Sequence, residues 1–567
     1  MSEASLSPSN RDHLDRVKSA VLQQFTLKKV PRWIETRTFL EGAPFSFKHH
    51  EYQLKLLEEE SNELNIKKCS QVGISEVAVR RTLAILDILN DIHAIYTLPT
   101  ASFAKTFVKS RFDPVIEGSK YLRGRLNSKI DSFEMKQLGS SFLYIKGTIG
   151  QAAAISVPAS LLVHDEVDFS DQTVLSSYHS RLTHSKYKLR MNLSTPTVPG
   201  FGIDERMQNS KQHYNFCKCC HCSQWFLPDY FDHVKIPGYT GDLREITKEN
   251  LHTVDYLSAR LICPHCGKEP NLDPENRGWV VKNPDEARTA GGYQVSPFDA
   301  PRIIKPSDLI HSGTQYKRYV DFINFNLGQC AEDKENALTR EELEDLWHQG
   351  ETPRFTRFAL GIDVGLVLHF TLGAVADDGT FVITHLERVP LAQFWDRLFA
   401  LMSRFYIEKI VIDSMPYADL VLTLQQRFER AYASVYVRSR SPELFNMVDQ
   451  TEDPEKLKNT LRAVNVNRDM AFDSLMADSR RGKLAVMAGP CQEEKEVWLK
   501  HLTDMRRVQK FDANDELYFH WEKSSKGVDH YHHSTLYFYI ACQMLGFGPV
   551  EMPYTNLLTK FKHRSTQ

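Results

Sequence analysis

The chain has 567 residues, which is enough for about four ordinary domains or for two large domains with insertions. With 70 Lys and Arg against 72 Asp and Glu, the formal net charge is −2, and 42% of the residues are hydrophobic. This composition excludes a disordered, collagen-like or disulfide-dense chain, and it excludes DNA binding through bulk positive charge alone. A protein of this composition that binds DNA must use a local patch or channel.

Signals for export or for a membrane are not evident in the sequence. The N-terminal segment has no apolar run typical of a secretory signal, and no uncharged apolar stretch reaches the roughly 18 residues that a membrane span needs. We therefore expect a cytoplasmic protein. Its ten cysteines are then predicted to be thiols or metal ligands rather than disulfides.

An α/β domain is predicted over residues 31–214, after a polar arm at residues 1–30. Predicted strands and helices alternate in this region, which is typical of a mainly parallel sheet. Helices are predicted over residues 50–64 and 76–89, and strands over residues 94–98, 161–163 and 189–193.

The segment from Lys67 to Ser75 has the pattern of a phosphate-binding loop between a strand and a helix. Such loops aim backbone N–H groups and a helix N-terminus at phosphate oxygens, and they need a cation and a hydroxyl nearby. Gly73 and Ser75 match the end of the pattern G-x-x-x-x-G-K-[ST]. Ile74 stands at its lysine position, and Lys68 stands at its first glycine position. A lysine at the loop entrance can fold back onto the phosphates, so Lys68 is the candidate cation.

Two acids, Asp165 and Glu166, follow the apolar run at residues 161–163. In a P-loop ATPase an acid at this place holds Mg²⁺, and the next acid can orient and deprotonate the attacking water. Ser194 and Thr195 end the next predicted strand, where a group that senses the γ-phosphate would lie. The region is therefore predicted to bind and hydrolyse ATP.

An aromatic segment with one amide side chain precedes the phosphate loop. Phe47, Tyr52 and Gln53 are candidates to stack on an adenine and to hydrogen-bond it. Ordinary packing of these residues against a helix is the alternative.

Residues 215–285 are predicted to form a cysteine-rich insertion with few periodic runs. Two C-x-x-C pairs stand 40 residues apart, and four thiolates at tetrahedral positions make a structural Zn²⁺ site. The overlapping pair of Cys217 and Cys220 leaves the register open, and four thiols without metal are the alternative. The preferred ligands are Cys219, Cys222, Cys263 and Cys266.

A charged helical linker is predicted over residues 286–352, a second α/β domain over residues 353–548, and a basic tail over residues 549–567. The second domain opens with a strand, so it is expected to build a sheet of its own. Its predicted strands are residues 358–363, 381–385 and 410–412, and its predicted helices are residues 391–405 and 530–545.

Three aspartates of the second domain stand where acids can converge. Asp363 and Asp413 each end a predicted strand, and Asp529 opens the last predicted helix. Carboxylates from two strands and a helix start can hold a pair of Mg²⁺ or Mn²⁺ ions, which activate water in phosphodiester cleavage. The pattern predicts an RNase H-like nuclease domain. Whether Glu387 or the histidines His530, His532 and His533 join this site stays open.

The order of these motifs resembles that of the large terminase subunits of tailed bacteriophages, particularly the lambda-like branch, from about residue 33 to residue 545. That order is an aromatic and Gln segment, a phosphate loop with a displaced lysine, L-L-V-H-D-E and S-T-P. One departure is Gln71, which stands where many terminases have Arg. The resemblance implies Lys68 as the displaced lysine, Ser75 as the metal hydroxyl, Asp165 as the metal acid, Glu166 as the catalytic glutamate, Ser194 and Thr195 as the coupling motif, and Asp363, Asp413 and Asp529 as the nuclease acids.

The resemblance implies a viral DNA-packaging motor that is also a nuclease. ATP hydrolysis would pull double-stranded DNA into a prohead, and a metal-dependent endonuclease would cut concatemeric genomes. The implied cofactors are ATP, Mg²⁺, or Mn²⁺ at the nuclease site, and structural Zn²⁺. The implied partners in the host cell cytoplasm are double-stranded DNA, the portal protein, the small terminase subunit and further copies of the chain, in a pentameric ring on the portal.

Two other classes of protein match part of the pattern. A transposase or integrase would use the three aspartates to join DNA strands, and it would not require the ATPase residues. A non-enzymatic zinc DNA-binding protein would carry a decayed ATPase domain. The sequence leaves open cos or headful cutting, the recognised DNA, the solution oligomer, and which of Arg80, Arg81 and Arg181 acts on ATP.

Overall fold

The chain divides into two compact units. Unit 1 comprises Met1–Glu332 and Gln509–Tyr518, and unit 2 comprises Asp333–Val508 and Phe519–Gln567. The predicted N-terminal arm up to residue 26 and the predicted tail lie outside the described residues. The computed structural model describes residues 27–149, 157–284, 288–331, 337–348, 354–437, 443–449, 461–487, 492–512, 516–523 and 527–545.

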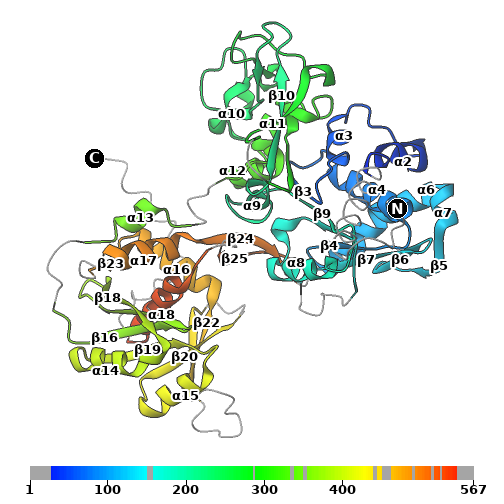
Figure 1. Cartoon of the computed structure of the whole chain (residues 1–567). Coiled ribbons are helices and arrows are strands. Elements are labelled where there is room, and N and C mark those ends of the chain that lie inside the picture. Colours follow the sequence, from blue (N-terminus) through cyan, green and yellow to red (C-terminus); the bar gives the residue numbers. More distant parts are fainter. Residues whose placement is uncertain are drawn as a thin grey trace. The chain divides into compact units, whose positions relative to one another are not determined.

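Unit 1 is built on an 11-stranded sheet within the described residues, and its middle strands run parallel (Figure 1). The order is β11-β10-β15-β3-β9-β8-β4-β7-β6-β5, with β14 paired to β10. Strand β8 is buried along its whole length, as expected for parallel strands covered on both faces. The strands are β3 (Glu63–Lys68), β4 (His93–Leu98), β5 (Leu126–Asp131), β6 (Met135–Leu138), β7 (Ser141–Gly147), β8 (Leu161–Asp165), β9 (Leu189–Ser194), β10 (Lys211–Lys218), β11 (Trp225–Phe226), β14 (Arg277–Val281) and β15 (Gly291–Val295).

Helix α4 is the central helix of unit 1, and it follows β3 directly along the chain. Most of its residues are buried, among them Arg80 and Arg81. The predicted helix over residues 50–64 is wrong in its second half, because α3 ends at Leu57 and the buried Leu64 already belongs to β3. The helices of this part are α2 (Val30–Arg37), α3 (Tyr52–Leu57), α4 (Ile74–Leu89), α5 (Ala101–Phe107), α6 (Asp113–Gly118), α7 (Lys120–Arg125), α8 (Gln172–Tyr178) and α9 (Gly202–Gln208).

The predicted linker over residues 286–352 is not purely helical, which corrects the sequence analysis. Strand β15 lies in this segment and pairs in parallel with β3 and β10, so the chain returns to the sheet of unit 1. Gly291 and Gly292 permit this, because a Cβ at either position would meet a neighbouring side chain at 2.6 Å. The segment also holds α11 (Pro306–Gly313), α12 (Tyr319–Phe322) and α13 (Arg340–Glu344).

The cysteine-rich insertion leaves the sheet at the end of β10 and returns at the start of β14, and these two strands pair antiparallel. The sequence between them forms short elements around a small apolar core. Those elements include β11, α10 (Tyr230–His233), β12 (Val234–Lys235) and β13 (Arg260–Leu261).

Unit 2 contains an eight-stranded sheet within the described residues, in the order β21-β22-β20-β19-β16-β17-β18-β23. Strands β16, β17 and β18 form an antiparallel meander, and β19 and β20 continue from β16 in parallel. The strands are β16 (Phe358–Asp363), β17 (Val367–Val375), β18 (Phe381–Pro390), β19 (Ile407–Asp413), β20 (Ala431–Val437), β21 (Phe445–Asp449), β22 (Arg462–Asn467) and β23 (Leu484–Val486).

Helix α18 packs directly on β16. A Cβ at Gly361 would lie 2.2 Å from Ser534 O and from Phe538 N, so only glycine permits this approach of helix and strand. The start of α18 is thereby held near the end of β16. The helices of unit 2 also include α14 (Phe394–Arg404), α15 (Ala418–Arg427), α16 (Arg468–Arg480) and α17 (Gln492–Thr503), and α18 spans His530–Met544.

A further pair of strands lies outside the two large sheets. Strands β24 (Met505–Phe511) and β25 (Leu517–Lys523) pair with each other. Among the described residues, no helix combines the length and the apolar character that crossing a membrane requires. The predicted α/β fold class is confirmed for the sheets of both units.

Candidate functional site

The candidate phosphate loop lies between β3 and α4, as the sequence predicts. Gly73 caps α4 with a φ of +69°, and a Cβ there would lie 2.9 Å from Gln53 Nε2. Gln53 Nε2 and Tyr52 OH both donate to the Val72 carbonyl, at 3.1 and 2.6 Å. These two buried side chains therefore support the loop from behind, whereas a contact with adenine stays a prediction.

Lys68 lies at the end of β3 and is buried against the acids that follow β8. Its Nζ is 3.0 Å from Glu166 Oε1. Burial alone would lower the pKa of Lys68, but the charges of Glu166 and Asp165 raise it above its ordinary value. The lysine at the loop entrance is thus a fixed cation that faces the two predicted ATPase acids.

Asp165 is buried at the end of β8 and contacts three other elements of the site. Its Oδ1 lies 3.4 Å from Ser75 Oγ at the start of α4, and its Oδ2 accepts a hydrogen bond of 2.7 Å from Tyr96 OH on β4. Burial and the Glu166 charge raise the pKa of Asp165 to about 6, against the effect of Lys68. Tyr96 was missed by the sequence analysis, although a tyrosine inside an apolar strand is a recognisable signal for a polar partner.

Glu166 adopts the left-handed backbone region, with a φ of +53°. This conformation costs a residue with a Cβ about 1 kcal/mol. Ser194 Oγ lies 3.4 Å from Glu166 Oε2 and donates to the Thr195 carbonyl at 2.8 Å. The ends of β8 and β9 are therefore connected through Glu166 and Ser194.

Asp168 extends this connection, and the sequence analysis did not single it out. It accepts hydrogen bonds from Thr197 N, Thr197 Oγ1 and Ile203 N at 2.8, 2.8 and 2.7 Å. Its own N–H donates to Ser194 Oγ at 3.2 Å. Burial raises the pKa of Asp168 to about 7, and the three donors oppose that rise. The network holds the segment after β9 against the acids.

Lys67 has a different partner from Lys68, although the two are neighbours in the sequence. Its Nζ is 3.0 Å from Asp204 Oδ1 on α9, and the two side chains are only 11% and 8% exposed. Removal of one charge from such a pair leaves the other buried without compensation, which destabilises by about 3–5 kcal/mol. Lys67 is therefore a structural residue.

Substitution of Asp204 by Asn should lower the free energy of unfolding of unit 1 by about 3 kcal/mol, because the Lys67 ammonium loses its buried partner. Urea unfolding followed by tryptophan fluorescence measures the change. The matched control is Asp242→Asn in the exposed pair with Arg244, which should change stability by less than about 1 kcal/mol. Equal effects of both substitutions would contradict the structural role of Lys67.

The arginine candidates differ in their surroundings. Arg80 and Arg81 are 0% and 2% exposed. Arg80 binds Glu76, Thr38 Oγ1 and the Phe39 carbonyl, so it stabilises the N-terminal side of unit 1. Both guanidinium groups are therefore buried within the chain, and which of the three arginines acts on ATP stays open.

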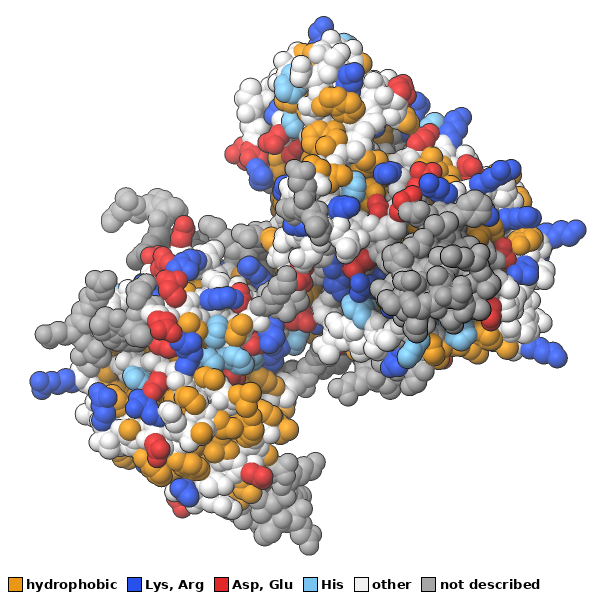
Figure 2. All heavy atoms as spheres, in the orientation of Figure 1, with side chains coloured by type: hydrophobic (Ala, Val, Ile, Leu, Met, Phe, Trp, Pro, Cys, Tyr) orange, Lys and Arg blue, Asp and Glu red, His pale blue; other side chains and the backbone are white. Residues whose placement is uncertain are grey.

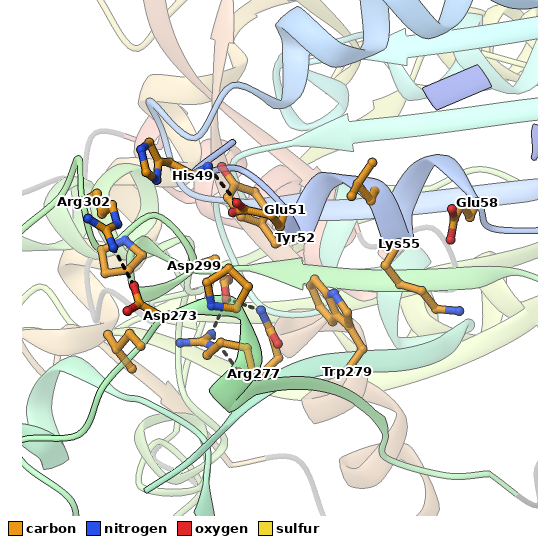
Figure 3. Close-up of a pocket in the computed structure, with 15 residues that line it drawn as sticks. His49, Glu51, Tyr52, Lys55, Glu58, Asp273, Arg277, Trp279, Asp299 and Arg302 are labelled. Carbon is orange, nitrogen blue, oxygen red and sulfur yellow. Dashed lines mark hydrogen bonds and ion pairs between the residues drawn. The ribbon is translucent and has the colours of Figure 1, made fainter. Parts of the chain in front are cut away.

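A cavity of about 290 Å³ lies beside Tyr52 in unit 1, between α3 and β14 (Figure 3). Its wall carries charges of both signs, including Lys55, the ion-paired Arg277 and Asp299, and Arg302. Of the three candidate adenine contacts, Tyr52 lines the cavity. The acids and the lysine around Glu166 do not line it, so the cavity is separate from the candidate hydrolytic site.

The four preferred cysteines converge in the insertion. Their Sγ atoms all lie within 4.8 Å of one another, with Cys219 to Cys266 at 3.7 Å and Cys222 to Cys263 at 3.8 Å. Sulfurs on the edges of a ZnS₄ tetrahedron are about 3.8 Å apart when Zn–S is about 2.3 Å. The donor set thus fits zinc in both chemistry and spacing. Cys217 instead contacts the Asn271 carbonyl through its Sγ.

Asp363 and Asp413 end the neighbouring parallel strands β16 and β19 of unit 2. Burial raises the pKa of Asp413 to about 6, against a hydrogen bond from Met415 N, and the charge of Asp363 adds to the rise. A buried carboxylate and a half-buried one repel each other at one sheet edge, so a cation between them would be stabilising.

Asp529 is the residue immediately before α18. It lies 3.3 Å from both His533 Nε2 and Lys523 Nζ, and the hydrogen bond from His533 and the charge of Lys523 lower its pKa in spite of burial. The next residue, His530, places its Nδ1 2.9 Å from Asp363 Oδ2. Asp529 is therefore the sequence neighbour of His530, which contacts Asp363.

The structure gives the contacts of Glu387 and of the histidines near the acids, and whether any of them joins the site stays a prediction. Glu387 forms ion pairs with Arg397 at 2.6 Å and with His385 at 3.1 Å, so it has other partners. His530 and His533 contact the acids, and His533 also lies 2.6 Å from Tyr436 OH. Figure 2 shows histidine side chains grouped on one face of unit 2. His532 packs against Phe472 instead.

Unit 1 has the parts of a P-loop ATPase: a parallel sheet, a glycine loop before a helix, a facing lysine, and two acids at the end of a buried strand. Residues 49–283 match the family described as phage terminase large subunit gpA, ATPase domain. This match confirms the predicted resemblance to phage large terminases.

The comparisons with curated proteins and with solved structures give weaker support than the family match. The search of curated proteins found no match. The HK97 bacteriophage large terminase is 12% identical, with 90% of this chain and 98% of that chain covered and a TM-score of 0.44. The large terminase of a thermophilic bacteriophage, solved in complex with ADP, is 9% identical, with 91% of this chain and 98% of that chain covered and a TM-score of 0.30. These TM-scores are too low to establish a common fold, so the assignment rests on the family match.

Proposed function

We propose that the chain is a terminase large subunit that couples ATP hydrolysis to translocation of double-stranded DNA into a prohead and cuts concatemeric genomes with unit 2. The observation that carries the proposal is the contact of Lys68 with Glu166, in a segment that matches a terminase ATPase family. This contact brings a displaced cation and a candidate catalytic base together at the end of β8. The proposed domain limits are those predicted from the sequence, except that the predicted linker contains strand β15, which belongs to the sheet of unit 1.

In the ATPase half, the loop of residues 69–73 and the start of α4 would bind phosphate through backbone N–H groups. Ser75 and Asp165, 3.4 Å apart, would hold Mg²⁺ with the nucleotide, where it would neutralise phosphate charge. Glu166 would orient water and take its proton. In the free chain, Lys68 forms an ion pair with Glu166. A bound nucleotide phosphate would attract Lys68 away from Glu166. Glu166 would therefore be free to act as the base only when nucleotide is bound.

The hydrogen bonds around Ser194 give this half a route for coupling. Ser194 contacts Glu166, and Asp168 connects Ser194 to the segment after β9. A change of partner at Glu166 would therefore alter the position of that segment. Such a displacement is the movement by which hydrolysis would act on DNA.

In the nuclease half, the proposal draws support from strand order. A meander of three strands, β16 to β18, followed by parallel β19 and β20 beside the first strand, is the arrangement of an RNase H-like sheet. Asp363, Asp413 and Asp529 would hold Mg²⁺ or Mn²⁺, which would activate water for phosphodiester cleavage. The neighbouring strand ends bring the first two acids together.

We also propose that Cys219, Cys222, Cys263 and Cys266 hold a structural Zn²⁺. Replacement of Cys263 by Ser should remove about one equivalent of zinc per chain and lower the melting temperature of the insertion, because bound metal contributes directly to folding. Metal analysis and thermal unfolding measure both effects. The exposed Cys220 is the matched control, and Cys220→Ser should keep the zinc. Purified wild-type chain without stoichiometric zinc would rule the site out.

The proposed partners are double-stranded DNA, the portal protein, the small terminase subunit and four further copies of the chain, assembled in the host cell cytoplasm. A near-neutral chain can grip phosphates transiently, as a stepping motor requires, since fewer fixed cations make binding less persistent. The salt dependence of DNA binding measures how many phosphates the chain contacts.

The test of the function uses the full chain and measures ATP turnover with and without DNA, together with cleavage of a plasmid in Mn²⁺. The proposal expects DNA-stimulated turnover and linearised plasmid. Joined DNA strands without ATP turnover would support a transposase or integrase. DNA binding with neither activity would support a non-enzymatic zinc protein, and either result would overturn the proposal.

A further inference from the structure

We propose that Asp363, His369 and His530 form a mixed carboxylate and imidazole site for a divalent first-row transition ion, and that this site makes unit 2 bind Mn²⁺ in preference to Mg²⁺. The inference deepens the proposed nuclease function and rests on it for its catalytic meaning. The ion-binding claim itself concerns these three side chains. His369 was not found by the sequence analysis, because it lies in the middle of the apolar strand β17.

The three side chains already stand at the spacing of metal ligands. One ligand atom from each lies within 4.8 Å of the other two, and His530 Nδ1 is 2.9 Å from Asp363 Oδ2. In an octahedral site with bonds of about 2.1 Å, neighbouring ligands are about 3.0 Å apart and opposite ligands about 4.2 Å apart. The upper limit of 4.8 Å is close to the distance between opposite ligands, so small side-chain shifts would let all three groups bind one ion.

Strand pairing fixes the position of His369. It lies directly opposite Asp363 in the antiparallel pair of β16 and β17, so the two side chains share one face of the sheet. His369 is 4% exposed, and its ring stacks on the His530 ring at 4.8 Å with an interplanar angle of 19°. Two imidazoles thus line the same carboxylate.

The bonding of His369 sets it apart from an ordinary buried histidine. Its Nδ1 atom is buried and makes no hydrogen bond of good geometry among the described residues, and the Val367 backbone is the polar group beside the ring. A buried polar atom without a partner destabilises a fold by about 1–3 kcal/mol. A bound metal ion, or a water attached to one, would give this nitrogen a partner.

The neighbours of the three residues are committed elsewhere. The His501 ring lies 5.3 Å from the His369 ring, but its Nδ1 accepts a hydrogen bond from Tyr531 N. Arg388, opposite His369 on β18, is tied to Glu493 and Glu494. Its positive charge is therefore balanced before a metal ion binds.

Ligand chemistry decides which ions this set favours. Carboxylates and water suit Mg²⁺, whereas imidazole nitrogen suits first-row transition ions, and affinity rises from Mn²⁺ towards the later metals. Two imidazoles beside one carboxylate therefore select a transition ion over Mg²⁺. Asp413 and Asp529 lie outside this donor set and stay available for a second ion in the proposed nuclease.

The experiment loads the full chain with Mn²⁺ and records pulsed electron paramagnetic resonance, which detects ¹⁴N nuclei bonded to Mn²⁺. The wild-type chain should show imidazole ¹⁴N coupling. His530→Asn should lose part of that coupling and bind Mn²⁺ about 10- to 100-fold more weakly. The His530 side chain is 42% exposed, so this variant should fold. His369→Asn is the second variant and should have the same effect where it folds.

His385→Asn is the matched control, since His385 lies on the same sheet and is paired with Glu387. It should keep both the coupling and the affinity. Absence of ¹⁴N coupling in the wild-type chain, or an unchanged signal in His530→Asn, would overturn the inference.

A second readout separates this inference from the nuclease function. Coupling that depends on His530 in a chain that cuts no plasmid would support the metal site and overturn the nuclease. Plasmid cleavage by a chain without ¹⁴N coupling would overturn the metal site and support the nuclease.

Discussion

Replacement of Glu166 by Gln should reduce DNA-stimulated ATP hydrolysis by about 100- to 10,000-fold, which is the range for loss of a general base. Gln has the same shape and can still accept a hydrogen bond from Ser194, so the connection between β8 and β9 should survive. The amide cannot take a proton from water. A malachite green phosphate assay at saturating ATP and DNA measures the turnover rate.

The same variant should keep nucleotide binding, because the phosphate loop and Lys68 are unchanged. With its ion pair to residue 166 weakened, Lys68 is freer to contact phosphate, so ATP affinity should be equal to or higher than that of the wild type. Fluorescent-nucleotide titration measures that affinity. Glu117→Gln, at an exposed glutamate of the same unit, is the matched control and should hydrolyse ATP normally. Turnover by Glu166→Gln within a few-fold of wild type would remove Glu166 from the mechanism.

Replacement of Asp363 by Asn should abolish metal-dependent plasmid cleavage, with a loss of at least about 100-fold, because a metal ligand is replaced by a neutral amide. The effect should be large because Asp363 is next to Asp413 across β16 and β19 and bonds His530, so it belongs to both parts of the proposed centre. Gel analysis of supercoiled, nicked and linear plasmid in Mn²⁺ measures cleavage.

ATP turnover distinguishes loss of cleavage from loss of fold in this variant. Asp363→Asn changes only unit 2, and DNA-stimulated ATPase should stay within about twofold of wild type, as for most substitutions away from the affected site. Asp396→Asn, at an exposed aspartate in the first turn of α14, is the matched control and should cut normally. A variant of Asp363 that cuts as well as the wild type would exclude the proposed nuclease centre.

Elements with long, distinctive patterns were predictable from the sequence. The predicted strand over residues 358–363 matches β16, and the predicted helix over residues 530–545 matches α18 to within a residue. Strand β16 is a continuous buried run with no charged residue before Asp363, and α18 contains the buried apolar run of residues 536–542, so local pattern decides both. The acids after β8, β16 and β19 were found for the same reason, since a buried run that ends in an acid is visible without the fold.

Residues whose importance depends on a distant partner were not predictable. Tyr96 and His369 sit inside apolar strands, and only the pairing of those strands brings them to Asp165 and Asp363. Asp168 gains its role from donors that lie about 30 residues further along the chain. Strand β15 has only five residues, so its sequence pattern is too short to distinguish it from the predicted helical linker. Each of these errors has the same origin, because strand neighbours are set by tertiary pairing and not by local sequence.

The order of the motifs by itself predicted two α/β domains, a cysteine-rich insertion, and the resemblance to phage large terminases that the match over residues 49–283 supports. Those conclusions depend on residue type and spacing, which the chain carries directly. Tertiary structure decided which lysine faces the acids, which cysteines converge, and that Glu387 is paired elsewhere while His369 joins Asp363. Such choices depend on distances of a few ångströms between residues far apart in sequence, and only strand register and close helix packing set those distances.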